Sequence, residues 1–349
     1  RVTKNDDFTD LPESYKEGYI LERDYIDWIN WDYPKSSLVY MKKDFTFGIH
    51  RQPVYWGYSK ANSPILSDNV YPLPHIQWTT EVKHLRYKFL HARLSPNSSP
   101  LKDTLNVRRN LSAHRVEFDI NPNFEFAFNE MIVYAYRDFE LGYLNPVNFL
   151  FTEEHVQGNL DNLLMALEYK WTIKPGLTSY GTWFFDELDF FKLFSGWWGN
   201  KFVFQLGVDY HPQRNLPSLN LEYTAARPWT YSHQFPVNSY TSAGRVLGLE
   251  AGPNTQSLKL SSTWQPGQNL LISCSMDYYQ QGQDLGANVF TSYDDRTDAD
   301  MDNDGFLLGS IDENTRINLA LNYYVHKLLV INFYWDTDTY MQLGMQFDL

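Results

Sequence analysis

The 349-residue sequence contains a single cysteine and is poor in basic residues. One thiol can form neither a disulfide framework nor a multi-thiolate metal site. No apolar stretch approaches the roughly 18 residues that a membrane-spanning helix needs, which excludes a helical membrane protein. Lys and Arg total 29 against 42 Asp and Glu, for a net charge of −13. This balance argues against nucleic acid as a partner, because phosphate binding needs a basic surface.

Aromatic side chains are abundant, with 11 Trp, 25 Tyr and 23 Phe making up 17% of the chain. The dominant pattern is alternation of apolar and polar residues with a period of two, as in half-buried β-strands. It is clearest in seven segments: 115–120, 123–132, 163–171, 201–210, 270–278, 317–323 and 341–349. Turn signals such as Asn-Pro-Asn at 121–123 and Lys-Pro-Gly at 174–176 separate the segments. The sequence therefore predicts an all-β chain of antiparallel hairpins.

Such alternation allows two interpretations. A soluble β-sandwich turns its apolar faces into a core, whereas a membrane barrel turns them toward lipid and lines its lumen with the polar faces. Three features favour the barrel: apolar faces that end in Tyr or Trp, charged and amide-rich opposite faces, and an apolar final strand like the C-terminal signal of outer-membrane barrels. We expect Phe204 and Leu206 to face lipid and Gln205 to face the lumen.

The length of the chain sets the size of such a barrel. At about 19–22 residues per strand and connection, 349 residues give on the order of 16–18 strands. We predict one transmembrane antiparallel outer-membrane β-barrel domain over residues 1–349, with residues 1–40 as a periplasmic-side or plug element that includes a helix around 11–29. Wall side chains do not fill so wide a lumen. Long irregular stretches such as 139–162 predict that inserted loops or short helices plug it.

Several short motifs interrupt the alternation in a fixed order. They are Trp56-Gly57, Pro64 to Asn69 with Pro72, Ala113 to Glu117, Tyr143 to Pro146, Asp161-Asn162, Tyr180 to Leu188, Tyr223-Thr224, Pro228 to His233 and Gly248 to Asn254. With these motifs, over roughly residues 45–255, the sequence resembles the capsule-assembly Wzi family of outer-membrane proteins.

The resemblance implies a monomeric barrel of roughly 18 strands in the bacterial outer membrane, which retains or organises exported polysaccharide at the cell surface. It implies a lectin-like protein rather than an enzyme, with surface polysaccharide and outer-membrane lipid as partners. The family also carries a small periplasmic helical bundle, and residues 1–40 show only a weak helical pattern here. The alternatives are a porin-like channel, whose acidic lumen would favour cations, and a structural subunit bound to other envelope proteins.

Aromatic residues outside the clean alternation are the candidate glycan contacts. Sugars present flat C–H faces that pack on aromatic rings, while amides and carboxylates hold their hydroxyls. Anchoring at the membrane interface explains clustered Trp equally well. The candidates are Trp197, Trp198, Trp229 and Tyr231.

An acidic stretch near the C-terminal end is the candidate metal site. Asp298, Asp300, Asp302 and Asp304 place carboxylates at every second position before Gly305. Hard oxygen ligands and a sharp turn suit Ca²⁺, although the glutamate of an EF-hand loop is not in register. A solvated acidic loop is the alternative interpretation.

No catalytic constellation is recognisable. His114 lies near Ser112, but nothing links a nucleophile, a base and an orienting acid. No glycine-rich phosphate loop follows a strand into a helix. We expect no catalytic residues and, apart from Ca²⁺, no cofactor.

Overall fold

The computed structural model describes residues 2–4, 19–21, 28–32, 34–96, 107–187, 189, 191–192, 195–212, 215–296, 306–326, 329–337 and 341–347. Three short strands form a separate antiparallel sheet: β1 (Val2–Lys4), β3 (Trp28–Asp32) and β2 (Tyr19–Leu21). The helix expected around 11–29 is wrong for the residues of that range that are described. They are strands, in agreement with the aromatic and β-branched side chains of Tyr19–Leu21 and Trp28–Asp32.

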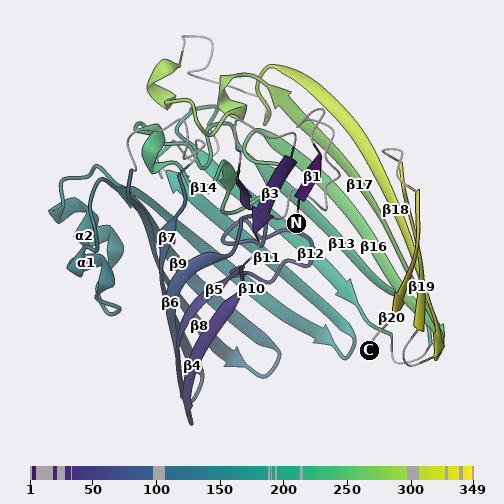
Figure 1. Cartoon of the computed structure of the whole chain (residues 1–349). Helices are drawn as coiled ribbons and strands as arrows, with labels where there is room; N and C mark the ends of the chain where they lie inside the picture. Colours follow the sequence, from purple (N-terminus) through teal and green to yellow (C-terminus); the bar gives the residue numbers. More distant parts are fainter. Residues whose placement is uncertain are drawn as a thin grey trace.

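In the described parts of the chain, fifteen strands form one strongly curved antiparallel sheet, the wall of a barrel (Figure 1). Each strand pairs with its neighbours in sequence order, from β4 at one end of the sheet to β20 at the other. The strands are β4 (Ser36–Lys42), β5 (Phe45–Gln52), β6 (Leu73–Val82), β7 (Leu85–Leu94), β8 (Arg109–Asn121), β9 (Phe124–Ala135), β10 (Asn162–Lys174), β11 (Leu177–Glu187), β12 (Lys201–Tyr210), β13 (Ser218–Ala226), β16 (Thr255–Gly267), β17 (Leu270–Gln283), β18 (Ser310–His326), β19 (Leu329–Asp336) and β20 (Met341–Phe347).

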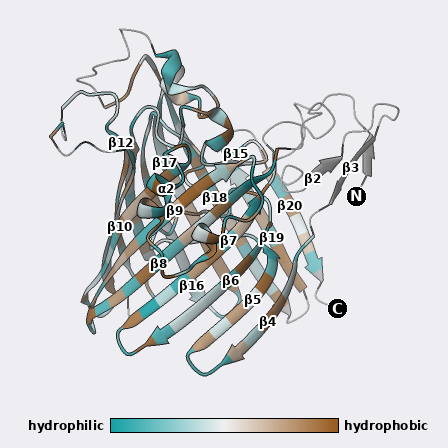
Figure 2. Ribbon diagram, turned by 90° about the vertical axis from the view of Figure 1, so that its left-hand side faces the viewer, coloured by the Kyte–Doolittle hydropathy of each residue, from teal (hydrophilic) through white to brown (hydrophobic). Residues whose placement is uncertain are grey.

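The two ends of the barrel differ in the length of their connections. At one end, which we call the turn end, two-residue turns join strand pairs such as β4–β5, β6–β7 and β8–β9. At the opposite end, the loop end, residues 53–72, 136–161 and 227–254 form much longer connections. Figure 2 shows the hydrophilic turns together at the lower end. Short turns at one end and long loops at the other are typical of outer-membrane barrels, in which the long loops are extracellular.

Alternation along the strands separates an outer face from a lumen face. On β12, Phe204 and Leu206 are 44% and 41% exposed and point outward, whereas Gln205 is fully buried and points into the lumen. The predicted faces of this strand are therefore confirmed. None of the helices in the described part of the chain has the length and apolar character of a membrane-spanning helix.

Two loop-end connections fold back into the lumen and fill part of it. We call residues 53–72 the first plug segment and residues 227–254 the second; the latter includes the small strands β14 (Thr241–Ser242) and β15 (Arg245–Val246). Their apolar residues pack against small and aliphatic lumen-facing side chains. This core includes Trp56, Ile65, Leu66, Tyr231, Tyr240 and Leu247 from the plug, and Leu90, Ala113, Met131, Leu164, Ala166 and Val203 from the wall.

The plugged lumen was predicted, but residues 139–162 were the wrong segment to assign to it. They form the short helices α1 (Leu141–Leu144) and α2 (Leu150–Val156), which lie outside the wall beside β7 and β9 (Figure 1). Their buried residues pack on outward-facing wall residues such as Ile132 and Tyr134. Polar side chains on the outer wall give this segment its partners, and the lumen is occupied by the two plug segments.

The assignment of faces predicts opposite effects for adjacent residues of β16. Leu260 is exposed on the outer face, and Ser261 lies on the lumen face opposite Ser275. Leu260→Arg should lower the free energy of unfolding in lipid vesicles by about 2–4 kcal/mol, because it places a charge in hydrocarbon. Ser261→Arg should change it much less, since that side of the lumen is solvent-accessible. Urea titration followed by heat-dependent gel mobility measures both, and equal effects would contradict the assignment.

Candidate functional site

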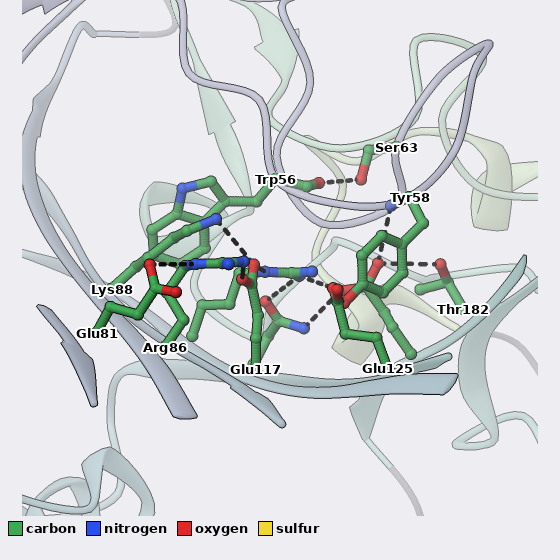
Figure 3. A network of polar contacts seen from close by, with 12 residues as sticks. Trp56, Tyr58, Ser63, Glu81, Arg86, Lys88, Glu117, Glu125 and Thr182 are labelled. Carbon is green, nitrogen blue, oxygen red and sulfur yellow. Dashed lines mark hydrogen bonds and ion pairs between the residues drawn. The ribbon is translucent and has the colours of Figure 1, made fainter. Parts of the chain in front are cut away.

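A buried polar network holds the first plug segment against the lumen face of the wall (Figure 3). At its centre is Arg115 of β8, whose guanidinium binds the carboxylates of Glu117 and Glu168. The Arg115 Nε–Glu117 Oε1 distance is 2.6 Å, and Arg115 also donates to the Asn129 amide oxygen at 2.9 Å. The network is contiguous because β8, β9 and β10 are adjacent and these residues all lie on their lumen faces.

The first plug segment is attached to the wall mainly through two lumen-facing carboxylates, Glu168 of this network and Glu222. Glu168 accepts a hydrogen bond from the backbone N–H of Tyr58 at 3.2 Å. Glu222 of β13 accepts one from the Ser59 hydroxyl at 2.8 Å and one from the Lys60 N–H at 3.2 Å. Burial raises the pKa of the Tyr58 phenol well above its usual value, so it stays protonated and donates to Glu125. Hydrogen bonds to charged groups in a dry site are stronger than neutral ones, so this loop is held firmly.

The two plug segments are also bonded to each other. The Tyr231 and Tyr240 hydroxyls donate to the carbonyl oxygens of Pro64 and Ile65, at 2.9 and 2.8 Å. Gly248 permits this approach, since a Cβ there would lie 2.4 Å from the Pro64 carbonyl oxygen. Together the segments form one closed unit in the lumen, which agrees with the predicted plug.

The plug packs against one side of the lumen and leaves a polar space on the other. A cavity of about 310 Å³ lies between the plug and strands β13, β16, β17 and β18. Its lining includes Asn62, Glu222, Lys259, Asp277, Tyr279 and Arg316. Lys259, Asp277 and Arg316 lie on one cross-strand row, so charges of alternating sign line this space.

An aromatic cluster at the loop end contains two of the predicted glycan contacts. Trp197 and Trp198 are partly exposed, with ring centroids 5.7 Å apart. Trp198 lies 5.3 Å from Tyr293, and Tyr293 lies 6.2 Å from His233. We call these four residues the loop-end cluster.

Cationic side chains stack on the rings of this cluster. The Arg296 guanidinium lies 3.1 Å from the Trp198 ring centroid, and Lys192 Nζ lies 4.2 Å from that of Trp197. Desolvation, helped by the charge of Lys201, lowers the pKa of the His233 imidazole to about 4, so His233 is neutral at physiological pH. With these two stacked cations, the loop-end cluster combines partly exposed aromatic rings, a neutral imidazole and positive charge.

The other two predicted contacts, Trp229 and Tyr231, are 1% and 0% exposed. Both have positive φ angles, 65° and 72°, which are unusual for bulky residues and require strong packing around them. The Tyr231 N–H donates to Asp186 at 2.6 Å, and the Trp229 N–H donates to the Gly286 carbonyl at 2.8 Å. These two side chains are part of the plug, and a sugar outside the protein would not reach them in this structure.

The predicted calcium ligands Asp298, Asp300, Asp302 and Asp304 lie outside the described residues. Within the parts of the chain that are described, no group of three or more His, Cys, Asp or Glu side chains is arranged to hold a metal ion. A Ca²⁺ site in the acidic loop stays a prediction.

Sequence reasoning missed most of the lumen network and half of the loop-end cluster. Arg115, Glu168 and Glu222 could have been suspected, because each is a charged residue near the middle of a strand on the face opposite its apolar stripe. Tyr293 and Arg296 carried no comparable signal, since they lie in an acidic loop about a hundred residues from Trp197 and Trp198.

Comparison with known proteins finds similarity at the level of fold. No protein-family model and no curated protein matches this sequence. Among solved structures, Escherichia coli Wzi matches with a TM-score of 0.62 at 13% identity, covering 92% of this chain and 68% of that one. Wzi is an outer-membrane protein involved in group 1 capsule assembly and is described as a carbohydrate-binding β-barrel. Two Pseudomonas aeruginosa proteins match less well: OccK10 (OpdN) with a TM-score of 0.46 at 10% identity, covering 88% and 76% of the two chains, and OprD with 0.43 at 11%, covering 86% and 72%. The chain thus has the fold of an outer-membrane β-barrel.

The lumen network predicts a large effect for one arginine and a small one for its neighbour. Arg115→Met leaves Glu168 buried without its cation and should lower the free energy of unfolding by about 3–5 kcal/mol. Arg86→Met should cost at most about 1 kcal/mol, because Arg86 is one-third exposed and Glu117 keeps two other cations.

Denaturant titration of the refolded variants measures both effects. Adding Glu168→Gln to Arg115→Met should recover part of the loss, because the buried negative charge is then absent. No recovery, or equal losses for the two arginine variants, would show that the network does not hold the plug.

Proposed function

We propose that this protein resides in the bacterial outer membrane and binds surface or capsular polysaccharide non-catalytically, so that the polymer is assembled and anchored at the cell surface. The observation that carries the proposal is the loop-end cluster. Trp197, Trp198 and Tyr293 present rings at the end of the barrel where long loops lie, which is the extracellular end in barrels of this kind.

The chemistry of the cluster suits a sugar polymer. Adjacent, mutually tilted rings give several C–H stacking surfaces without a deep pocket. Lys192, exposed beside the Trp197 ring, adds a positive charge that would attract the carboxylates of an acidic polymer. Each contact would be weak, and retention would come from many repeats that engage many barrels at once.

The plug also favours a binding protein over an open pore. Two loop segments fill part of the lumen with a packed core and a buried polar network, which a general diffusion channel does not need. The similarity in fold to Wzi, a carbohydrate-binding β-barrel, also supports a binding protein over an open pore.

A porin-like channel is the second candidate, and one observation favours it. The cavity beside β16, β17 and β18 is lined by charged and amide side chains, as in a solute pathway. A third candidate, a structural subunit attached to other envelope proteins, would be supported by stoichiometric co-purification of such proteins.

The loop-end cluster predicts a specific loss of polymer binding. Trp198→Ala should release polysaccharide from cells and weaken retention of the protein on immobilised polymer. The substitution removes an aromatic stacking face and the ring on which the Arg296 guanidinium packs. Trp171→Ala is the matched control, an exposed tryptophan at the turn end of β10. It should leave polymer retention unchanged. If both variants insert normally and retain polymer equally, the glycan site lies elsewhere.

The plug predicts low conductance in planar bilayers. The purified barrel should give no large, steady current, since the two plug segments occlude the lumen. Glu222→Ala removes the acceptor for Ser59 and Lys60 and should increase the frequency of openings. A large, stable, cation-selective current through the unaltered protein would favour the porin instead.

A further inference from the structure

Residues 139–160, which we call the outer hairpin, form a helical hairpin on the outside of the barrel wall. Figure 1 shows α1 and α2 beyond the wall, next to β7 and β9, and Figure 2 shows α2 in front of the same strands. The wall residues under this hairpin are outward-facing, because they alternate with lumen residues such as Asn129 and Met131. They include His91, Ser112, His114, Glu130 and Tyr134.

Outward-facing polar side chains hold the backbone of the outer hairpin. The Glu130 carboxylate accepts a hydrogen bond from the Phe151 N–H at 2.7 Å. The Ser112 hydroxyl donates to the Tyr143 carbonyl at 2.5 Å, and the Tyr87 hydroxyl donates to that of Pro146. The hairpin is therefore docked by specific contacts on three neighbouring strands.

The position of these contacts places the hairpin at the depth of the lipid-facing wall. Glu130 lies on a row of outward-facing residues that runs across neighbouring strands. On one side the row continues through Met165, Phe185 and Phe202. On the other side it continues through His114 and Phe89. A carboxylate, an imidazole and hydroxyls on the outer wall would be very unfavourable against hydrocarbon. The hairpin covers them, and Glu130 and His114 are almost completely buried beneath it.

The surface that the outer hairpin turns away from the wall is rich in apolar side chains, which lie among exposed polar residues such as Asn145, Thr152 and His155. Val147 is 85% exposed and Phe149 is 67% exposed. Other exposed apolar residues share this surface: Phe139, Leu141, Phe151, Val156 and Leu160. The segment 139–160 contains no Lys or Arg, and its three glutamates, Glu140, Glu153 and Glu154, are half-buried or buried. Apolar residues exposed in such number on a small segment mark an interaction surface.

We propose that the outer hairpin is embedded in the membrane beside the barrel, and that the occupant of its apolar surface is the acyl chains of the surrounding lipid. The surface is continuous with the lipid-facing wall, since Met165 and Leu163 on β10 border the strand that carries the hairpin. Many of the hairpin's backbone groups are hydrogen-bonded within its short helices and turns, and others bond to wall side chains. A non-strand segment in a bilayer needs such internal partners. The barrel thus carries a lateral lipid-contact element near the extracellular side.

Site-directed fluorescence in lipid vesicles tests this placement. Cys274 is the single cysteine, so a Cys274→Ser background allows one environment-sensitive label per variant. Phe149→Cys reports on the hairpin, Leu206→Cys on the lipid-facing wall, and Asp44→Cys on water at a turn. Heat-dependent gel mobility confirms that each variant is folded.

We expect the label at position 149 to be quenched by nitroxides on the lipid acyl chains, as the label at 206 is. Iodide in the buffer should quench it far less than the label at 44. Iodide quenching equal to that at 44 would overturn the proposal by placing the hairpin in water. Protection from both quenchers would also overturn it, because a second copy or another protein would then cover the surface.

Discussion

The structure depends first on the inability of a bilayer to hydrogen-bond a peptide group. Every backbone N–H and C=O at membrane depth must find a partner within the protein, and antiparallel strand pairing supplies these partners around the wall. Pairing in turn fixes the alternation of side chains, so that one face of each strand meets lipid and the other meets the lumen. On this wall the rule has two consequences: the lumen face must be filled or wetted, and the outer face must be apolar or covered.

Polar side chains of the wall are accommodated in this chain in two ways, one in the lumen and one on the outer face. Inside, carboxylates of β10 and β13 are buried but bonded to Arg115 and to the backbone of the first plug segment. Outside, polar residues of β8 and β9 are covered by the outer hairpin, whose backbone they satisfy. In each case a loop supplies hydrogen-bond donors or acceptors to a wall side chain. The polar side chains of the wall therefore determine where each loop docks.

The sequence alone was sufficient for the wall and insufficient for its loops. Period-two alternation, a local property, predicted the all-β class and the strand faces on β12. The length of the chain and its irregular stretches predicted a plugged lumen. Which side of the wall a loop folds onto is decided by side chains far away in sequence. Residues 139–162 look as suitable for a plug as 227–254, and what distinguishes them is their bonds to the outward-facing Tyr87, Ser112 and Glu130. For the same reason the adjacent aromatics Trp229 and Tyr231 resembled a surface site and are buried, whereas Trp197 and Trp198 are partly exposed.

The span of the plug contacts along the chain has a consequence for biogenesis. Tyr58 is bonded to Glu168, 110 residues later, Ser59 to Glu222, 163 residues later, and Ser67 to Leu247, 180 residues later. Closing such long loops is entropically costly, so these contacts form late. The first plug segment is therefore synthesised before its partners and stays unpacked until the strands from β6 to β13 have been made and paired. Until then its apolar residues are exposed, and a periplasmic chaperone or the insertion machinery would have to shield them. The plug is complete only after the second plug segment, between β13 and β16, has followed.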